Sequence, residues 1–243
     1  LIFIHVVIAL LVSVVFITML ERKIMSYIQL RKGPNKIGLG GLITPVVDSL
    51  KLLIKKGYFP YKSNSFFFSF SPILCVLILL LVWFIFPFSE NTNISQFSLL
   101  VVICVMSLGV YSNFFSGWGS NSKYSLLGSL RGVAQMVSIE VSFIFILLII
   151  FFFNSNFSLS YFYWNNFPLF LVFPCITFIW IILTVAETNR APFDFTEGES
   201  ELVSGYNTEY GGLGFALLFL GEYGMILFFG FFTTLIWGLI IFS

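Results

Sequence analysis

Long apolar runs separated by shorter polar connections dominate the hydrophobic pattern of this chain. A helix that crosses the ~30 Å hydrocarbon core of a bilayer needs about 20 apolar residues, and each run is close to that length. The pattern therefore predicts an all-α polytopic membrane protein with about six spanning helices in a single membrane domain, residues 1–243. The six runs are 1–20, 70–88, 97–115, 133–153, 167–186 and 213–242. The last run exceeds a straight span, so we expect it to tilt or to continue past the bilayer.

The first polar connection, residues 21–68, contains a further helical pattern. Val46, Leu50 and Leu53 recur at helical spacing, whereas Asp48 and Lys51 fall on the opposite face. A helix with one apolar face and a basic polar face is typical of a helix that lies in the membrane interface. The sequence therefore predicts one interfacial amphipathic helix within this connection.

Basic residues occupy alternate connections only. Nine of the twelve Lys and Arg residues lie between the first and second runs, Lys123 and Arg131 lie between the third and fourth, and Arg190 lies between the fifth and sixth. The two remaining connections contain no basic residue. Because short basic connections stay on the inner side of a membrane, the N-terminus is predicted to be outside and the three basic connections inside.

The composition excludes several classes of function. Hydrophobic residues make up 58% of the chain, charged residues make up 9%, and the mean hydropathy is +1.01, so the chain belongs in a bilayer. A net charge of +1 gives no basic surface for nucleic acid. Cys75, Cys104 and Cys175 stand singly inside apolar runs, so the sequence predicts neither a disulfide framework nor a metal or iron–sulfur site.

Residues 187–212 form an acidic inner loop with a single base, Arg190. Carboxylates this close together repel one another, so some of them must bind a proton or pair with a cation. Phe193, Phe195 and Leu202 interrupt the acids and favour a loop packed against the protein, although a solvated acidic loop is the alternative. Six of the eleven acids of the chain lie here: Glu187, Asp194, Glu197, Glu199, Glu201 and Glu209.

Three acids lie within or at the end of apolar runs. They are Glu140 in the fourth run, Glu187 at the end of the fifth and Glu222 in the last. An ionised acid near the bilayer centre costs at least ~2.5 kcal/mol, so these side chains are expected to face protein or water. Several such acids in one chain favour a proton path; the alternative is that each is protonated and hydrogen-bonded to a neighbouring helix.

The fourth run has two chemical faces at helical spacing. Glu140 projects from one side, opposite a polar stripe that indicates either a hydrated edge or serine-mediated helix packing. The stripe consists of Arg131, Gln135, Ser138 and Ser142.

Three segments carry a resemblance to a known family. They are ERKIMSYIQLRKGPNKIG (21–38), GWGSNSKYSLLGSLRGVAQMVSIEV (117–141) and AETNRAPFDFTEGESELVSGYNTEY (186–210). With these segments the chain resembles subunit 1 of proton-pumping NADH:ubiquinone oxidoreductase, respiratory complex I. The resemblance covers nearly the whole chain, and the third segment is highly specific. The phenylalanine-rich composition is similar to that of mitochondrially encoded members.

The resemblance implies a subunit that helps to form the ubiquinone-binding chamber and links quinone reduction to proton translocation. It assigns no directly catalytic residue and no metal to this chain. The residues that it places at the quinone chamber are Arg22, Lys51, Arg190, Asp194, Glu197, Glu199 and Glu201. Those that it places on the proton path are Glu140, Glu187, Glu209 and Glu222.

The resemblance also implies partners and a location. Ubiquinone would be the substrate, while NADH, FMN and the iron–sulfur clusters would be bound by other subunits. The partners would be other complex I subunits, notably the quinone-site subunits of the hydrophilic arm and small membrane-arm subunits, together with the lipid bilayer and no nucleic acid. The chain would lie in the mitochondrial inner membrane, with its N-terminus in the intermembrane space and the acidic loop on the matrix side. The family has eight spanning helices, so its last two have no counterpart in these residues.

Two other classes of protein share part of this pattern. A free-standing proton or cation transporter would show inverted repeats and helices broken near the midplane, and the sequence shows neither. The homologous membrane subunit of a membrane-bound hydrogenase shares the acidic residues but needs no quinone. The segments RKGPN and EGESELVSGYNTEY favour the quinone enzyme.

Overall fold

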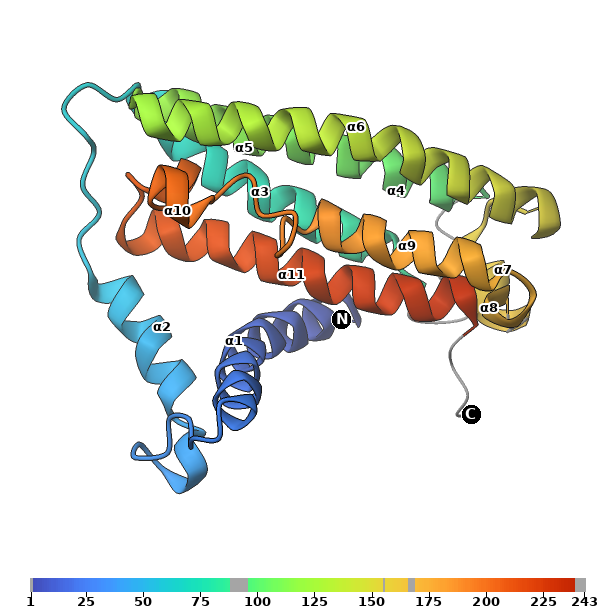
Figure 1. The fold of residues 1–243 in the computed structure, drawn as a ribbon, viewed down its shortest axis with the longest axis horizontal. Coiled ribbons are helices and arrows are strands. Elements are labelled where there is room, and N and C mark those ends of the chain that lie inside the picture. The colour runs from blue at the N-terminus through green and yellow to red at the C-terminus, as the bar shows by residue number, and fades with distance from the viewer. Residues whose placement is uncertain (1, 88–95, 155, 166–168, 239–243) are drawn as a thin grey trace.

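The computed structural model describes residues 2–87, 96–154, 156–165 and 169–238. Within these ranges every regular element is a helix, which confirms the predicted fold class (Figure 1). Five helices in the described part are long and apolar enough to cross a membrane, so the chain is a multi-pass membrane protein. They are Phe3–Ile28, Ser65–Ile85, Ser98–Ser120, Lys123–Phe153 and Gly212–Trp237.

The fifth predicted run is divided into two shorter helices, α8 (Leu169–Val172) and α9 (Pro174–Glu187). Pro174 starts α9 because proline lacks an N–H and its fixed φ suits the first turn of a helix. At 1.5 Å per residue α9 is ~21 Å long, which is shorter than the ~30 Å hydrocarbon core. The described residues thus contain five full-length spans and a shorter apolar helix at the position of the fifth predicted run.

The first and last spans end differently from the predicted boundaries. Helix α1 (Ile2–Ile28) continues past residue 20, because Glu21, Arg22 and Lys23 are all good helix formers. It ends where Leu30 adopts a left-handed conformation (φ 58) and the Arg31 N–H donates to the Ser26 carbonyl at 2.9 Å. Helix α11 (Gly212–Trp237) ends at the left-handed Gly238, so the rest of the last run lies outside the described residues.

The predicted helix of the first connection is confirmed as α2 (Thr44–Ile54), which follows the 3-10 turn η1 (Leu39–Gly41). Helix α2 stands outside the main bundle (Figure 1). Its apolar stripe is uncovered: Val46 is 44%, Leu50 50% and Leu53 56% exposed. An uncovered apolar stripe is what an interfacial helix requires, and its position in a membrane interface remains a prediction.

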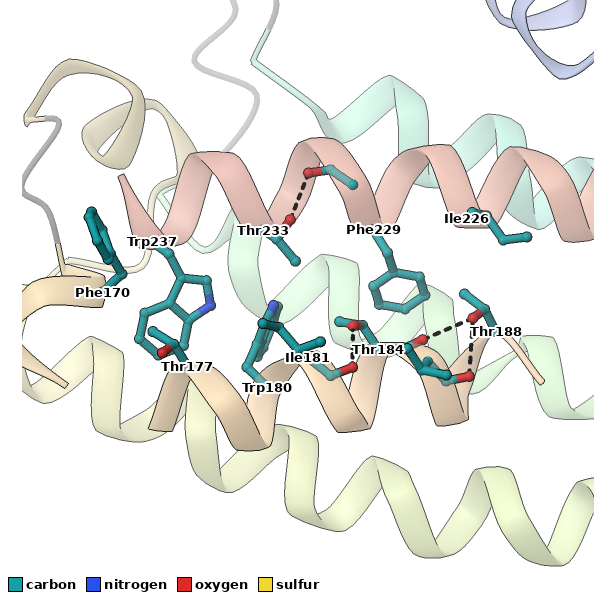
Figure 2. Close-up of a pocket in the computed structure, with 12 residues that line it drawn as sticks. Phe170, Thr177, Trp180, Ile181, Thr184, Thr188, Ile226, Phe229, Thr233 and Trp237 are labelled. Atoms are coloured by element: carbon teal, nitrogen blue, oxygen red, sulfur yellow. Dashed lines mark hydrogen bonds between the residues drawn. The ribbon is translucent and has the colours of Figure 1, made fainter. Parts of the chain in front are cut away.

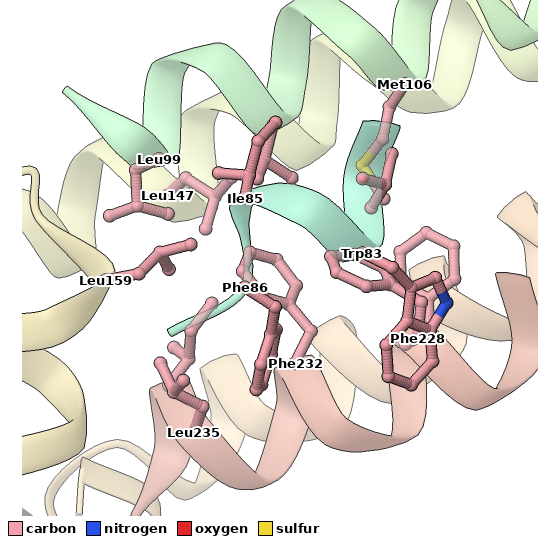
Figure 3. Close-up of a cluster of buried hydrophobic side chains, with 14 of the residues drawn as sticks. Trp83, Ile85, Phe86, Leu99, Met106, Leu147, Leu159, Phe228, Phe232 and Leu235 are labelled. Atoms are coloured by element: carbon pink, nitrogen blue, oxygen red, sulfur yellow. The ribbon is translucent and has the colours of Figure 1, made fainter. Parts of the chain in front are cut away.

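The bundle is built around α3 (Ser65–Ile85), which packs against α11 and α5 (Gly109–Ser120). Helix α5 continues α4 (Ser98–Ser107) and packs in turn on α6 (Lys123–Asn154). Figure 3 shows the aromatic core, in which Trp83 of α3 and Phe86, which follows α3, lie against Phe228 of α11, with ring centroids 6.2 Å apart in both pairs. Two short helices, α7 (Leu159–Asn165) and α8, lie at the same end of the bundle as this core (Figure 1).

The three basic connections meet at the opposite end, which we call the charged end. The Asn64 N–H donates to the Gly119 carbonyl at 2.9 Å, and Asn121 Nδ2 donates to the Lys62 carbonyl at 3.0 Å. These bonds join the first and second basic connections, and the third connection also lies there, with α10 (Glu199–Leu202) and η2 (Gly205–Asn207) beside the start of α6 (Figure 1). The orientation rule requires such a common end; which compartment it faces remains a prediction.

Candidate functional site at the charged end

The acidic segment 187–212 is folded onto the bundle. Thr196 is 1%, Tyr206 2% and Leu202 4% exposed, which confirms the packed-loop interpretation and excludes a wholly solvated loop. Two other apolar residues of the segment, Phe195 and Val203, are exposed at 52% and 67%.

Helix α6 holds the acidic segment through one side chain and two glycines. Gln135 Nε2 donates to the carbonyls of Ala186 at 2.8 Å and Phe193 at 2.9 Å. A Cβ on Gly128 would come within 2.9 Å of the Thr196 carbonyl oxygen, and a Cβ on Gly132 would overlap the Thr196 side chain. Small residues on α6 therefore let the backbone of the segment approach the helix closely.

The end of the segment is anchored on α3 by Tyr210. Its ring stacks on Phe68 with the centroids 4.1 Å apart, and its hydroxyl lies 2.8 Å from the hydroxyl of Ser71. Burial raises the pKa of Tyr210 to about 12, even though the hydrogen bond with Ser71 acts in the opposite direction. The segment is thus fixed on α6 at its start and on α3 at its end.

Arg190 of this segment joins α1 to α11. Its Nη1 donates to Glu21 Oε1 at 3.0 Å, and the Tyr223 hydroxyl donates to Glu21 Oε2 at 2.9 Å. The guanidinium carbon lies 4.6 Å from the centroid of the Tyr223 ring, in a cation–π contact. Burial alone would lower the pKa of Arg190, but its contacts with Tyr223 and Glu21 outweigh burial and raise it. The group therefore supplies a fixed positive charge between two helices.

A cavity of about 590 Å³ lies beside this cluster, between the inner half of α1 and one face of α11; we call it the α1–α11 chamber. Met25 and Phe219 give it apolar walls, and Glu21 and Tyr223 belong to both the chamber and the Arg190 cluster. Cationic residues line it as well: Arg22, Arg31 and Lys32. A cavity that combines apolar walls with a few convergent charged groups suits a ligand with a polar head and an apolar body.

Tyr206 links the acidic segment to Glu222 of α11. The Tyr206 hydroxyl donates to Glu222 Oε1, and the neighbouring Asn207 Nδ2 donates to Glu197 Oε1 at 3.1 Å. Burial raises the pKa of Tyr206 well above its ordinary value, and the nearby negative charges of Glu222 and Glu197 add to this effect. Tyr206 thus remains a neutral donor at physiological pH.

Two small cavities connect the three acids of the apolar runs. The first, of about 60 Å³, is lined by Glu222 and Glu187 together with Ser112, Asn113 and Asn189. The second, of about 10 Å³, is lined by Glu187 and Glu140, so Glu187 belongs to both. We call Glu222, Glu187 and Glu140 the carboxylate row.

The carboxylate row contains polar atoms that the protein itself leaves unpaired. Within the described residues, Glu187 Oε2, Glu140 Oε1 and Asn189 Oδ1 are buried without a hydrogen-bond partner. Buried polar groups of this kind usually bind ordered water, and a cavity of ~60 Å³ has room for about two molecules. The row therefore combines unpaired carboxylate oxygens with space for water.

The other sequence-predicted residues are spread more widely. Arg22 lines the chamber and forms an exposed ion pair with Asp48 at 3.0 Å, whereas Lys51 lies on the exposed α2 and does not line the chamber. Arg131 pairs with Glu201 on the surface of α6. Asp194 Oδ1 accepts the Glu197 N–H at 3.3 Å and so shapes the loop.

Two predicted acids are not joined to the row. Glu209 lies in the turn before α11 and lines neither small cavity. Glu199 is the first residue of α10, and its side chain lies outside the part of the chain that the structure describes.

The polar stripe of the fourth run is divided between two uses. Arg131 and Gln135 bind the acidic segment, as described above. Ser138 and Ser142 instead donate to carbonyls of their own helix, those of Gln135 at 2.7 Å and Ile139 at 3.0 Å. The stripe thus provides the docking site for the loop.

Sequence reasoning missed Glu21, Tyr206, Tyr223 and the role of Gln135. One signal pointed to Glu21: Arg190 is the single base of an acidic loop, and Glu21 begins the basic connection predicted on the same side. The two tyrosines carry no charge or spacing signal, because only packing brings them to the acids. The spacing of Gln135 placed it in the polar stripe, but nothing in the sequence indicated that it binds the acidic segment.

A further groove of about 490 Å³ runs between α9 and α11. Figure 2 shows its threonines bonded within their own helices, where Thr184 donates to the Ile181 carbonyl at 2.8 Å and Thr233 to the Gly230 carbonyl at 2.7 Å. Its lining contains no ionisable side chain, so it offers nothing for proton or redox chemistry.

Comparison with known proteins gives one consistent result. A sequence profile described as NADH dehydrogenase matches residues 1–240. NADH-ubiquinone oxidoreductase chain 1 of Aedes aegypti is 46% identical over 225 residues, which cover 91% of this chain and 72% of that protein. The protein of the same name from Phoca vitulina is 48% identical, with coverage of 96% and 74%, and that from Gallus gallus is 50% identical, with coverage of 93% and 70%. The chain therefore belongs to the NADH dehydrogenase family, the family of chain 1 of NADH-ubiquinone oxidoreductase.

Proposed function

We propose that this chain is a membrane-arm subunit of a proton-translocating NADH:ubiquinone oxidoreductase and that the α1–α11 chamber receives ubiquinone. The observation that carries the proposal is the chamber itself: about 590 Å³ of partly apolar space with the Glu21–Arg190–Tyr223 cluster in or beside its wall. The similarity to chain 1 of NADH-ubiquinone oxidoreductases supports the choice of ligand.

The lining of the chamber matches the chemistry of a quinone. Met25 and Phe219 suit an isoprenoid tail or a ring face, and Arg22 and Arg31 suit carbonyl oxygens whose negative charge grows during reduction. Fixed cations stabilise such developing charge without having to reorganise. The electrons come from an iron–sulfur cluster on another subunit, and NADH and FMN are also bound by other subunits. The role of this chain is therefore to bind and orient the quinone.

The carboxylate row lies beside the chamber and gives a route for coupling. Reduction of a quinone to a quinol consumes two protons and transiently places negative charge near the acidic segment. Asn207 donates a hydrogen bond to Glu197, and its chain neighbour Tyr206 donates one to Glu222. A change of charge at Glu197 therefore reaches Glu222, the first member of the carboxylate row. Protonation changes then pass from Glu222 through Glu187 to Glu140. Asp194, Glu199, Glu201 and Glu209 complete the acidic field of the loop.

The location and partners follow from the same proposal. The chain lies in the mitochondrial inner membrane with its N-terminus in the intermembrane space. The charged end then faces the matrix, where the part of the 21–68 connection beside the chamber and the segment 187–212 meet the quinone-site subunits of the hydrophilic arm. Small membrane-arm subunits and lipid cover the apolar flanks of the bundle.

Two rival functions make different use of the same features. The membrane subunit of a membrane-bound hydrogenase would keep the carboxylate row but would need no chamber for a quinone. A free-standing transporter would need its ion site at broken helices in mid-membrane. In the described residues the break at Phe173 lies at the end away from the carboxylates, and α4 and α5 meet at Leu108, whose backbone stays in the right-handed helical region, so that span continues through the junction.

The test is a photoreactive ubiquinone analogue applied to the intact enzyme, with the labelled peptides identified. We expect label on residues 21–34 or 219–223, with loss of label when a quinone-site inhibitor competes. An analogue with the same photoreactive group on an alkyl chain but no quinone ring is the control for non-specific labelling. Label on neighbouring subunits alone would overturn the chamber assignment.

A further inference from the structure

We propose that the charged end also carries a binding site for the phosphate-bearing headgroup of an anionic membrane lipid, where the start of α3 meets the end of α5. A surface hollow of about 370 Å³ is lined there by Lys62, Ser63, Asn64, Trp118 and Asn121. It shares no lining residue with the α1–α11 chamber, so the proposal is independent of quinone binding.

The backbone around the hollow is held in place by two hydrogen bonds. Asn121 Nδ2 donates to the Lys62 carbonyl at 3.0 Å, and the Asn64 N–H donates to the Gly119 carbonyl at 2.9 Å. Asn121 ends α5 in a left-handed conformation (φ 52), which turns the chain directly into Lys123 at the start of α6. The side chains of the hollow are thus carried by a fixed junction of three helices.

The charge at this junction is positive and uncompensated. Lys62 and Lys123 are both exposed, and neither forms an ion pair with any residue that the structure describes. Between Asp48 and Glu140 the sequence contains a single acid, Glu90, which lies in the connection after α3. Lys62 lies in the wall of the hollow beside amide and hydroxyl groups, and Lys123 follows Asn121 by two residues. Such a set suits a phosphate, which accepts several hydrogen bonds and carries negative charge.

Aromatic side chains continue from the hollow along the bundle. Trp118 is 48% exposed and stacks on Phe67, with the centroids 5.1 Å apart. Phe66 and Phe70 are 66% and 39% exposed and stack on each other at 5.8 Å. Tryptophan beside the polar end of a span is typical of the level of lipid headgroups, and the phenylalanines below it give a surface for acyl chains. The combination fits an anionic phospholipid better than a soluble phosphate, which would make no use of the aromatic surface.

The experiment compares two photoactivatable lipids in the assembled enzyme, reconstituted into phosphatidylcholine nanodiscs. One is phosphatidylglycerol and the other is phosphatidylcholine, both with the same diazirine-bearing acyl chains. We expect phosphatidylglycerol to label peptides that contain Phe66, Phe70 or Trp118, and phosphatidylcholine to label them much less. Each lysine near a membrane surface contributes about fivefold to affinity for anionic lipid, so the Lys62→Gln, Lys123→Gln pair should weaken labelling about 25-fold.

Matched variants keep this test decisive. The Lys55→Gln, Lys56→Gln pair removes the same charge from the segment just before α3 and should leave labelling unchanged. The Lys62→Arg, Lys123→Arg pair should retain the labelling. If the glutamine pair fails to assemble, the arginine pair and the comparison of the two lipids test the proposal instead. Equal labelling by both lipids, displacement of the lipid by millimolar inorganic phosphate, or a crosslink showing another subunit seated in the hollow would each overturn the proposal.

Discussion

At the scale of single residues, Arg190 has the most consequential position. It belongs to the acidic segment, yet its ion pair is with Glu21 of α1 and its cation–π contact is with Tyr223 of α11. One side chain therefore connects three parts of the chain that are far apart in sequence, beside the chamber. Exposed ion pairs contribute little to stability, so the value of this arrangement lies in where it holds the charge.

Replacement of Arg190 by Gln should impair use of the quinone more than it impairs folding. Without its partner, the Glu21 carboxylate would repel the negative charge that develops on a reduced quinone. The KM for a short-chain ubiquinone should rise about tenfold, in line with the loss of one charged hydrogen bond. Steady-state kinetics of the assembled enzyme with ubiquinone and with an artificial acceptor upstream of the chamber would measure this. Asp48→Asn, which breaks only the exposed Arg22 pair, is the matched control, and an equal change in both variants would contradict the prediction.

Replacement of Tyr206 by Phe should destabilise the charged end in a pH-dependent way. At neutral pH, Glu222 loses its donor, which should cost about 1–2 kcal/mol and lower the denaturation midpoint. Burial raises the pKa of Tyr206, so the folded chain holds the phenolic proton more firmly than the unfolded chain does. The contribution of the hydroxyl is therefore complete below pH ~10 and falls as the pH rises above that value. The difference in denaturation midpoint between the parent and the variant, which we call the gap, should narrow above pH ~10.

Thermal denaturation at neutral and at alkaline pH would measure that gap. Tyr61→Phe is the control, since Tyr61 is fully exposed at 102% and should show no gap at either pH. A gap that widens with pH would contradict the assignment of Tyr206 as a neutral donor.

At the scale of elements, α6 is the helix on which the site depends. Gly117 of α5 approaches Ser129 on one flank of α6, and Thr196 approaches Gly128 and Gly132 on another. The sequence pattern predicted a span over 133–153, but α6 begins ten residues earlier, at Lys123. The glycines gave no signal of their own, because what they accommodate comes from a segment some seventy residues later, such as Thr196 and Gly205.

Gly128→Ala should loosen the acidic segment from α6. The added Cβ would lie 2.9 Å from both the Thr196 carbonyl oxygen and the Gly205 Cα, and backbone atoms cannot move aside cheaply. Overpacking of this kind costs about 1–3 kcal/mol. We expect a lower thermal midpoint of the assembled enzyme and faster proteolysis within 187–212. Gly230→Ala is the control, because a Cβ there meets nothing within 4 Å; an equal loss in both variants would refute the docking role.

Most helices were predictable because their hydrophobic runs are continuous, and the differences have local causes. Pro174 separates α8 from α9, Leu30 ends α1 later than the change of polarity at Glu21, and Gly238 ends α11. Each boundary depends on backbone conformation, which a hydropathy pattern does not contain.

At the scale of the whole molecule, three acids that are far apart in sequence form one row. Glu140, Glu187 and Glu222 come from α6, α9 and α11, and each was identifiable as an acid in or beside an apolar run. Their alignment along two cavities was not predictable, since it depends on how three helices pack. For the same reason the sequence did not show that Glu209, also an acid, lines neither cavity.

Glu140→Gln and Glu187→Gln should lower the number of protons pumped per electron in the assembled enzyme. A glutamine preserves shape and hydrogen bonding but cannot exchange a proton, so it interrupts the row. Proton uptake and NADH oxidation measured together in proteoliposomes would show the ratio. Glu209→Gln should leave the ratio close to normal. A normal ratio in both Glu140→Gln and Glu187→Gln would disprove the coupling route.

The docking of residues 187–212 on α6 also bears on how the protein is made. During synthesis α6 leaves the ribosome well before this segment. Gln135, Gly128 and Gly132 are therefore made before the residues that they contact in the finished fold. Arg190 then meets Glu21 of α1, which was translated far earlier. The Glu21–Arg190–Tyr223 cluster is therefore assembled only after α11 has been made, and a nascent chain that has reached α9 contains the α1 wall of the chamber but not this cluster.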